Sequence, residues 1–327
     1  MKLRLLAAAA LATVLASPAM ADMQEYRVLT QSRDIGHLKI DRQGQSIAID
    51  YDYKQNGRGP TIKEAVTLGK DGAPVSWTIT GRTTFGNAVS ESFRRNAAGA
   101  QWRDLAGPGM IKGKDAPRYY ASQNGSPLDV ALLAKALLAD ADRAMPVAPG
   151  GIARLTERAR STFDGPDGKL EVVTYELSGL SLNPTYVTLD ARGDLFAVAS
   201  AGFILARKGY ETAADRPLRE MAEKLASDRF AQLQAEGAKR FAGPVRIRNV
   251  RVFDPKAKAL SAPMDVAFNG NRITAVVPVG SQATPGETSI DGEGGTLVPG
   301  LYEMHGHMGQ EDALMNVLAG ITSVRDM

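Results

Sequence analysis

The sequence predicts a mainly β protein with some α structure: an antiparallel β-rich N-terminal domain, a second β region, and a closing β-α-β unit. From about residue 25 to residue 106, apolar and polar residues alternate with a period of two, and short Gly, Pro and Asp segments interrupt the alternation. Only two stretches, residues 128–143 and 215–240, have long runs at helical spacing. At the other end of the chain, an apolar run at residues 297–301 is followed by a short helical pattern and a second apolar run.

The first residues have the pattern of a signal peptide. Lys2 and Arg4 precede an apolar run at residues 5–16, and small residues follow up to Ala21. A membrane anchor is the alternative, but the run is shorter than the roughly 20 residues that span a bilayer. We therefore expect residues 1–21 to be a signal peptide that is cleaved after Ala21. The mature protein would be periplasmic or secreted and would have no transmembrane segment.

Composition excludes some classes of protein. The chain has 39 basic and 36 acidic residues, and cleavage after Ala21 would remove two basic and no acidic residues. Such a balanced charge gives no electrostatic footprint for nucleic acid, so no nucleic-acid partner is expected. There is no cysteine and hence no disulfide framework, which large exported domains do not require because they can bury a sizeable core.

Residues 22–215 are expected to form the β-rich N-terminal domain. Short turns between the strands favour an antiparallel meander over β-α-β units. Its expected strands are residues 46–53, 61–68, 75–80, 89–94, 101–105, 153–162, 170–177, 185–190 and 195–199, whereas 202–207 is ambiguous. The helix at 128–143 begins near Pro127 and ends before Pro149-Gly150-Gly151. No motif in this domain points to chemistry, so docking, substrate gating and ligand binding in a curved sheet stay open.

A second helix is expected at residues 215–240. Asp215 is a plausible N-cap, Pro217 falls in the first turn, and Gly243-Pro244 follows the end. We interpret residues 216–243 as a helical linker between domains. Packing of this helix against the N-terminal sheet is an equally good interpretation.

Residues 244–298 have β texture again. Residues 245–254 alternate, residues 264–268 and 272–277 are expected strands, and Asn269-Gly270-Asn271 between them is a strong hairpin signal. Residues 288–297 lead to the final apolar run.

The most informative motif is His305-Gly306-His307. In a strand, alternate side chains share a face, so the two imidazoles can point the same way and hold one divalent metal ion. Glu303 lies on the same alternation, and we expect it to be solvated or to support the site from behind. Asp326, at the end of the next expected strand, could also face the site. Two unrelated histidines are the alternative interpretation, and for His37, which is isolated in β texture, a structural role is expected.

The segment from residue 245 to residue 327 resembles the N-terminal part of the amidohydrolase superfamily, most of all its imidazolonepropionase-like and exported dipeptidase-like branch. The features that carry the resemblance occur in a fixed order. They are a strand ending in Val252-Phe253-Asp254, an Asn-Gly hairpin followed by Arg272-Ile273, Ile290-Asp291-Gly292-Glu293-Gly294, Leu297-Val298-Pro299-Gly300-Leu301, His305-Gly306-His307, and Gly320-Ile321-Thr322-Ser323-Val324-Arg325-Asp326-Met327.

The resemblance implies a β-sandwich segment at residues 244–298 and, from residue 299 to residue 327, the start of a metal-dependent (β/α)8 hydrolase barrel. It also implies that His305 and His307 ligate a divalent metal, usually zinc, with one or two ions in a complete protein. The metal-activated water would hydrolyse a C–N bond in a small amide, dipeptide or cyclic amide.

The remaining ligands and the general base of such enzymes come from later strands, and the sequence has no histidine after His307. Since a barrel needs about 250 residues, we expect a truncated barrel and an inactive 327-residue chain. The alternative function is a periplasmic β-domain ligand-binding protein with a vestigial hydrolase segment.

Overall fold

The computed structural model describes residues 22–327 except residues 32, 167, 201 and 309, so the expected signal peptide lies outside the described part. Strands hold 53% of the residues and helices 15%, which confirms a mainly β protein. The chain divides into two compact units, Met1–Lys224 (unit 1) and Leu225–Met327 (unit 2). Within the described part, no helix is both long enough and apolar enough to span a membrane.

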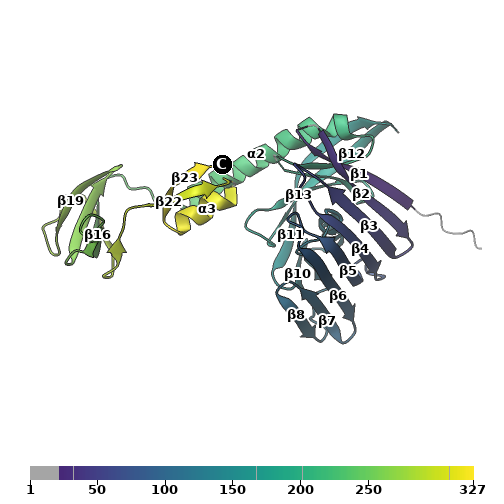
Figure 1. Cartoon of the computed structure of the whole chain (residues 1–327), viewed down its shortest axis with the longest axis horizontal. Coiled ribbons are helices and arrows are strands. Elements are labelled where there is room, and N and C mark those ends of the chain that lie inside the picture. Colours follow the sequence, from purple (N-terminus) through teal and green to yellow (C-terminus); the bar gives the residue numbers. More distant parts are fainter. Residues whose placement is uncertain (1–21, 32, 167, 201, 309) are drawn as a thin grey trace, which may run out of the picture. The chain divides into compact units, whose positions relative to one another are not determined.

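Unit 1 is built on one 15-stranded sheet (Figure 1). Its strands are β1 (Asp22–Thr30), β2 (Arg33–Gln43), β3 (Ser46–Tyr53), β4 (Thr61–Leu68), β5 (Pro74–Arg82), β6 (Ala88–Asn96), β7 (Gly99–Asp104), β8 (Gly107–Lys112), β9 (Tyr119–Tyr120), β10 (Ala144–Ala148), β11 (Ile152–Gly165), β12 (Gly168–Ser178), β13 (Thr185–Asp190), β14 (Leu195–Ala199) and β15 (Ile204–Arg207).

The sheet joins two meanders through its first and last strands. β1 pairs with β2 on one side and with β15 on the other, so that Tyr26 lies opposite Arg207. All neighbouring strands are antiparallel except β9 and β10, which run parallel. The antiparallel meander is therefore confirmed, and the ambiguous residues 202–207 contain a strand.

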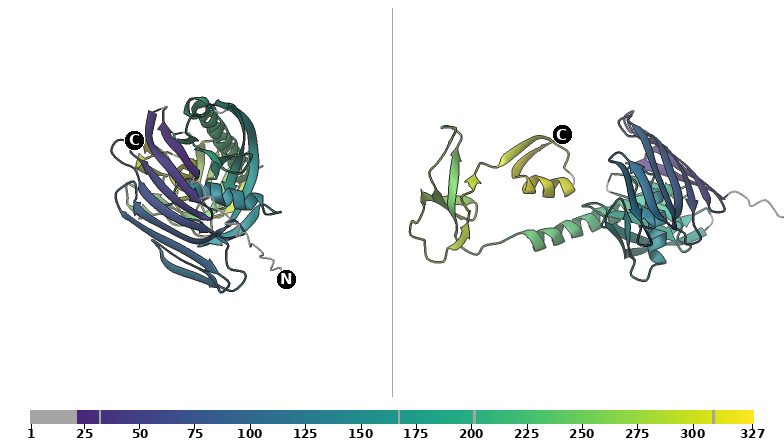
Figure 2. Two further views of the ribbon diagram at one scale, coloured as in Figure 1. Left: turned by 90° about the vertical axis from the view of Figure 1, so that its right-hand side faces the viewer. Right: turned by 90° about the horizontal axis from the view of Figure 1, so that it is seen from below.

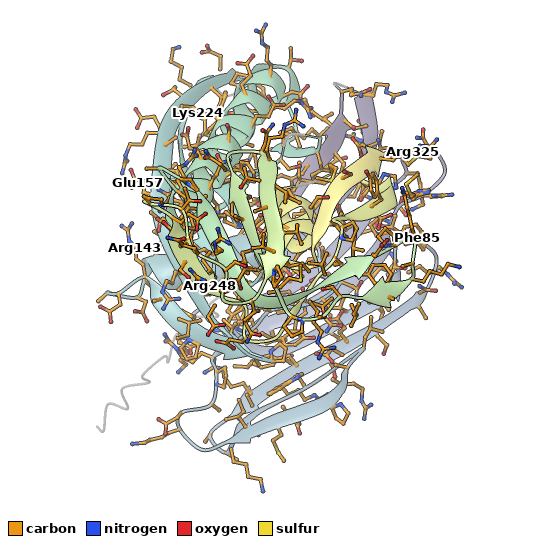
Figure 3. All side chains as sticks on the ribbon, turned by 90° about the vertical axis from the view of Figure 1, so that its left-hand side faces the viewer. Phe85, Arg143, Glu157, Lys224, Arg248 and Arg325 are labelled. Carbon is orange, nitrogen blue, oxygen red and sulfur yellow. The ribbon has the colours of Figure 1, made fainter. Side chains whose placement is uncertain are left out.

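The sheet curves around α1 (Leu128–Leu138), which lies inside the concave face (Figure 2). Leu132, Leu133 and Leu137 of α1 belong to the same buried core as Trp77 and Phe93 from the sheet. Charged side chains such as Arg143 and Glu157 lie on the outer surface of the unit (Figure 3).

The first helix is shorter than the sequence predicted. It ends at Leu138 instead of residue 143, because Asp140 forms a turn of its own. The Asp140 carboxylate accepts the Asp142 N–H at 3.2 Å, and the Asp140 carbonyl accepts the Arg143 N–H at 3.1 Å. A local Asx turn of this kind competes with helix propagation. Residues 144–148 then form β10, a strand that was not predicted from the sequence.

The second helix, α2 (Glu211–Gly237), begins four residues before the expected cap. Asp215 is therefore not the N-cap: it lies in the second turn, is buried, and pairs with Arg219 at 2.5 Å. Pro217 likewise lies inside the helix and not in its first turn. The cap signals in the sequence therefore placed the start of α2 too late. The chain enters the helix one turn earlier, where Glu211 accepts the Gly209 N–H at 2.7 Å.

The N-terminal part of α2 packs on unit 1, and this favours the packing interpretation for that part. Ala214, Leu218 and Ala222 are buried, whereas Phe230 and Leu233 further along are exposed. Next to the start of α2, the rings of Phe196 and Tyr210 meet edge to face at 5.3 Å. The boundary between the compact units falls inside α2, between Lys224 and Leu225.

Unit 2 contains a six-stranded sheet centred on β16 (Val245–Asp254). The other strands are β17 (Ala259–Leu260), β18 (Met264–Asn269), β19 (Arg272–Pro278), β20 (Thr288–Asp291) and β21 (Thr296–Leu297). The expected hairpin joins β18 and β19, where Asn269 pairs with Arg272 and Gly270 takes a φ of 56°. The chain then forms β22 (Leu301–Gly306), α3 (Gln310–Leu318) and β23 (Ile321–Asp326). A second sheet packed face to face, as a sandwich requires, stays a prediction.

Candidate functional site

The expected strand–helix–strand unit is present at the end of the chain. β22 and β23 pair in parallel, with Leu301 opposite Ile321 and Glu303 opposite Val324, and α3 connects them. Parallel neighbours require a crossover of this kind, and their carboxyl ends meet at one edge. The structure therefore brings His305, His307 and Asp326 to the same end of a two-stranded parallel sheet. It shows no further barrel strands within the described residues.

Two glycines in or beside β22 allow side chains of β23 to approach closely. A Cβ atom on Gly306 would lie 2.4 Å from Val324 Cγ1, and one on Gly300 would lie 2.0 Å from Thr322 Oγ1. Non-bonded atoms do not approach each other this closely, so the packing at both positions requires glycine. The glycine between the two histidines thus fixes the strand against its neighbour.

The two imidazoles lie beside each other at the carboxyl end of β22. Their ring centroids are 5.3 Å apart with an interplanar angle of 83°, and both residues are exposed. His305 lies in β22, whereas His307 follows the last residue of the strand, Gly306. The structure thus places the two imidazoles side by side, and a shared strand face stays a prediction.

A backbone contact selects the tautomer of His307. Its Nδ1 lies 3.2 Å from the Met327 carbonyl oxygen, which can only accept a hydrogen bond. The contact therefore requires a proton on Nδ1, and in the neutral ring this leaves the lone pair on Nε2. Histidines that ligate metals are usually oriented in this way, with the second ring nitrogen donating to a carbonyl or carboxylate.

Glu303 and Asp326 support the backbone around the pair. Glu303 Oε1 accepts the His305 N–H at 2.8 Å, and Asp326 Oδ1 accepts the Met308 N–H at 3.2 Å. Each carboxylate thus holds the chain beside one histidine. This arrangement agrees with a supporting role for Glu303 and places Asp326 at the same edge.

The donor set fits part of a metal site. Zinc sites in proteins use at least three side-chain ligands, and in the described part of the chain no three His, Cys, Asp or Glu side chains are grouped to hold an ion. Two imidazoles with a selected tautomer supply two nitrogen ligands. A full site needs donors from elsewhere.

His37 lies in β2 of unit 1, where its Nε2 is 3.4 Å from Asp50 Oδ2 on the neighbouring strand. This cross-strand contact accounts for the residue within the sheet. The structural interpretation of His37 therefore has a direct partner in the structure.

Comparisons with known proteins add no relative. No family model, no curated protein and no solved structure matches the chain.

Unit 1 holds a group of buried acids that the sequence analysis missed. Glu64 on β4 and Glu91 on β6 are 4% and 2% exposed on the concave face of the sheet. Glu64 accepts Trp77 Nε1–H at 2.7 Å and the Ser126 N–H at 2.5 Å. A sequence signal did exist: in Ile62-Lys63-Glu64-Ala65-Val66 the alternation puts the glutamate on the apolar, core-facing side of the strand.

The segment between β9 and α1 is fastened to these acids. Glu91 accepts hydrogen bonds from Tyr120 Oη–H at 2.7 Å, from Asn124 Nδ2–H at 2.8 Å and from the Gln123 N–H at 3.0 Å. Asp129, in the first turn of α1, accepts one from the Ser122 hydroxyl. Burial, reinforced by repulsion from Glu64, raises the pKa of Asp129 to about 7.

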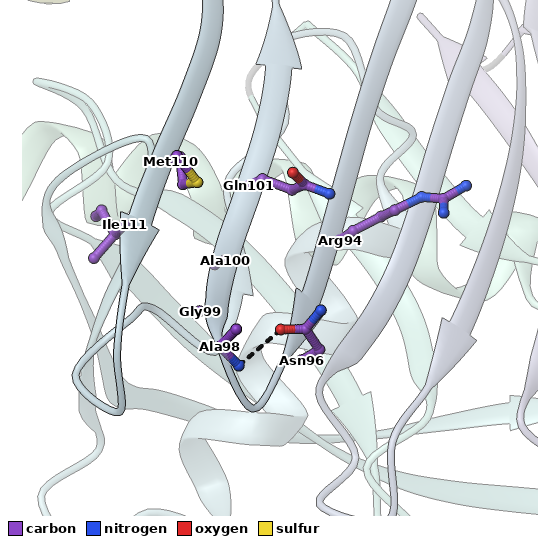
Figure 4. Close-up of a pocket in the computed structure, with 8 residues that line it drawn as sticks. All are labelled: Arg94, Asn96, Ala98, Gly99, Ala100, Gln101, Met110 and Ile111. Carbon is purple, nitrogen blue, oxygen red and sulfur yellow. Dashed lines mark hydrogen bonds between the residues drawn. The ribbon is translucent and has the colours of Figure 1, made fainter.

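A smaller depression of about 120 Å³ in unit 1 is lined by residues of β6, β7 and β8 and by Ala98 in the turn between β6 and β7, where Asn96 Oδ1 accepts the Ala98 N–H at 2.8 Å (Figure 4). It presents no group suited to catalysis.

Proposed function

We propose that residues 245–327 are the N-terminal part of a metal-dependent amidohydrolase in which His305 and His307 ligate a divalent ion, preferably zinc. The substrate class is a small molecule with a hydrolysable C–N bond, such as an amide, a dipeptide or a cyclic amide. The signal pattern at residues 1–21 adds that the protein acts in the periplasm or outside the cell.

The observation that carries the proposal is the paired imidazoles at the carboxyl end of β22, with ring centroids 5.3 Å apart. In (β/α)8 enzymes, catalytic groups lie at the carboxyl ends of the strands. The parallel β22–α3–β23 unit gives the pair that position, and the Met327 carbonyl leaves Nε2 of His307 available.

Exposed apolar side chains of the same unit give independent support. Tyr302 and Leu318 are 72% and 73% exposed, and several neighbours are also exposed. Contiguous apolar surface usually marks a contact site. A barrel would cover it with later strands and helices, and those elements would also supply the missing ligands and the general base.

In the proposed site, the metal ion and the surrounding residues would have different roles. A divalent ion supplies a bound water of lowered pKa and polarises the scissile carbonyl. His305 and His307 would hold this ion through ring nitrogens. Glu303 and Asp326 fix the backbone on either side of the pair through the contacts to the His305 and Met308 N–H groups. Gly306 keeps β22 in register beside Val324.

The test compares histidine variants in a polypeptide that contains a complete barrel, obtained by following the gene beyond codon 327. His305→Ala and His307→Ala should each abolish hydrolysis of a dipeptide panel, whereas His37→Ala should retain nearly full turnover. The 327-residue chain should show no hydrolysis even with added zinc. Full activity of His305→Ala, or a reading frame that stops at codon 327, would refute the proposal and favour the ligand-binding alternative.

A further inference from the structure

We propose that unit 1 binds a small molecule with a primary ammonium group on an apolar body, in the cavity beside α1, with Asp129 as its counter-ion. This inference rests on unit 1 alone and is independent of the hydrolase proposal.

The cavity has the size of a small-molecule site. Its volume is about 380 Å³, and the side chains that line it include Tyr119, Ser122, Asp129, Leu133 and Leu180. Ligand pockets range from about 300 to 1,000 Å³ and combine mainly apolar walls with a few polar groups. The segment 119–123, α1, and the loops at 149–150 and 180–185 enclose this cavity.

Its walls are mainly apolar. Leu133 and Val130 of α1 form one wall, and Pro149 and Leu180 form another. Leu180, which lines the cavity, is 38% exposed. An occupant with an apolar body would cover this side chain.

The polar side of the cavity is acidic and has no cation. Asp129 lines it together with the Ser122 hydroxyl. The ion pairs found among the described residues include no Lys, Arg or His partner for Asp129, Glu64 or Glu91. Each glutamate is bound only by neutral donors from Trp77, Tyr120 and the 122–126 segment.

This electrostatic environment selects the charge of the occupant. Burying a carboxylate without a counter-ion is costly, and a cation that enters the cavity removes that cost. An anionic ligand would be repelled by the carboxylate of Asp129. A metal ion is disfavoured, since the residues that line the cavity include one carboxylate and no histidine or cysteine. A primary ammonium, with three donors, fits Asp129 Oδ and the Ser122 oxygen.

The same argument predicts a dependence on pH. The ionisable groups around Asp129 are Glu64 from β4, Glu91 from β6, and the tyrosines Tyr51, Tyr119 and Tyr120, and none of them is basic. Since the pKa of Asp129 is about 7, roughly a tenth of it is ionised at about pH 6 and about nine-tenths at about pH 8. Affinity for an ammonium ligand should rise nearly tenfold over that range.

The experiment titrates the full chain with 2-phenylethylamine and with 2-phenylethanol, which has the same shape and no charge, by calorimetry or NMR. At pH 8 the amine should bind at least about tenfold more tightly than the alcohol. Asp129→Asn should remove that difference, while the exposed Asp164→Asn control should keep it. Gly150→Trp should weaken both ligands, because Gly150 lines the cavity and has no heavy atom within 4 Å of a Cβ position.

Folding of the variants is checked by circular dichroism, and Asp129→Asn is expected to fold because Asn keeps the shape of the side chain and removes its charge. Equal binding of the amine and the alcohol would show that the cavity does not recognise the ammonium group, and this would overturn the proposal. Unchanged amine affinity in folded Asp129→Asn, or no binding of the amine at millimolar concentration, would overturn the proposal.

Discussion

Replacing Asp129 by Asn should make the stability of unit 1 less sensitive to a rise in pH between 3.8 and about 7. Burial raises the pKa of Asp129 from 3.8 to about 7, so the folded protein binds more protons than the unfolded chain between these values. Stability then falls as the pH rises, with a slope of 1.36 kcal/mol per pH unit up to the folded pKa. Below pH 3.8 the aspartic acid is neutral in both states, and the two side chains should be nearly equivalent.

The size of the effect follows from this slope. Between about pH 5 and pH 7 the wild type loses at most ~2.7 kcal/mol relative to Asp129→Asn, and above pH 7 the difference stays constant. Asp129 is partly exposed, so solvent screens part of its charge. We therefore expect that, relative to the wild type, Asp129→Asn is ~2 kcal/mol more stable at about pH 8 than at about pH 5.

Tryptophan fluorescence during urea unfolding measures this difference directly. The chain has two tryptophans, Trp77 and Trp102, and both lie in unit 1, so the signal reports on this unit alone. Glu64 also has a raised pKa, but it is present in both proteins, so its own titration contributes to both stability curves. A stability difference that is the same at both pH values would refute the reasoning.

Three further predictions concern other parts of the chain. Glu64→Ala should cost ~3 kcal/mol in the urea assay, because Trp77 Nε1–H and the Ser126 N–H lose their buried acceptor, whereas the exposed neighbour Lys63→Ala should cost no more than ~0.5 kcal/mol. In unit 2, the hydrogen bonds from Arg246 hold the pKa of Glu287 at about 2, below 4.5, so the stability that this pair contributes is present above pH 4.5 and lost as the pH falls towards 2. The protection of the β16 amides, measured relative to the intrinsic exchange rate at each pH, should therefore decrease on acidification in the wild type and change less in Glu287→Gln; an equal decrease in both would contradict this account. N-terminal sequencing of exported protein should begin at Asp22, and retention of Met1 on cytoplasmic protein would contradict the signal assignment.

Local sequence patterns correctly predicted those elements whose structure depends on residues close in the chain. The alternation in residues 46–53 and 61–68 gave β3 and β4, because one face of each strand is buried in the core. Gly270 supplies the positive φ that the two-residue hairpin loop needs, so the Asn-Gly signal located β18 and β19. The His-x-His spacing predicted two neighbouring imidazoles, and the ring centroids of His305 and His307 are 5.3 Å apart, although His307 lies just after the end of β22.

The pairing of strands that are far apart in the chain could not be predicted from local sequence patterns. The contact of β1 with β15 joins residues about 180 positions apart, and it turns two meanders into one sheet. The start of α2 was also misplaced, since Asp215 and Pro217 have the composition of a helix start although tertiary packing buries Asp215 one turn inside. The burial of Glu64 and Glu91 was not predicted, because a glutamate in an alternating strand is normally expected to face solvent. Only the alternation of the neighbouring residues shows that these two positions face the core.

The central claim is that His305 and His307 bind one divalent ion through ring nitrogens, and imidazole ¹⁵N NMR during zinc titration of the 327-residue chain tests it most directly. The chain has three histidines, so the spectrum is simple to assign with single-histidine variants. We predict that His307 starts as the Nδ1–H tautomer, because Nδ1 donates to the main-chain oxygen of Met327, and that ring-nitrogen resonances of His307 and His305 shift together. His37 should stay unchanged beside Asp50. A response of His37 before the pair, or of only one member of the pair, would contradict the account.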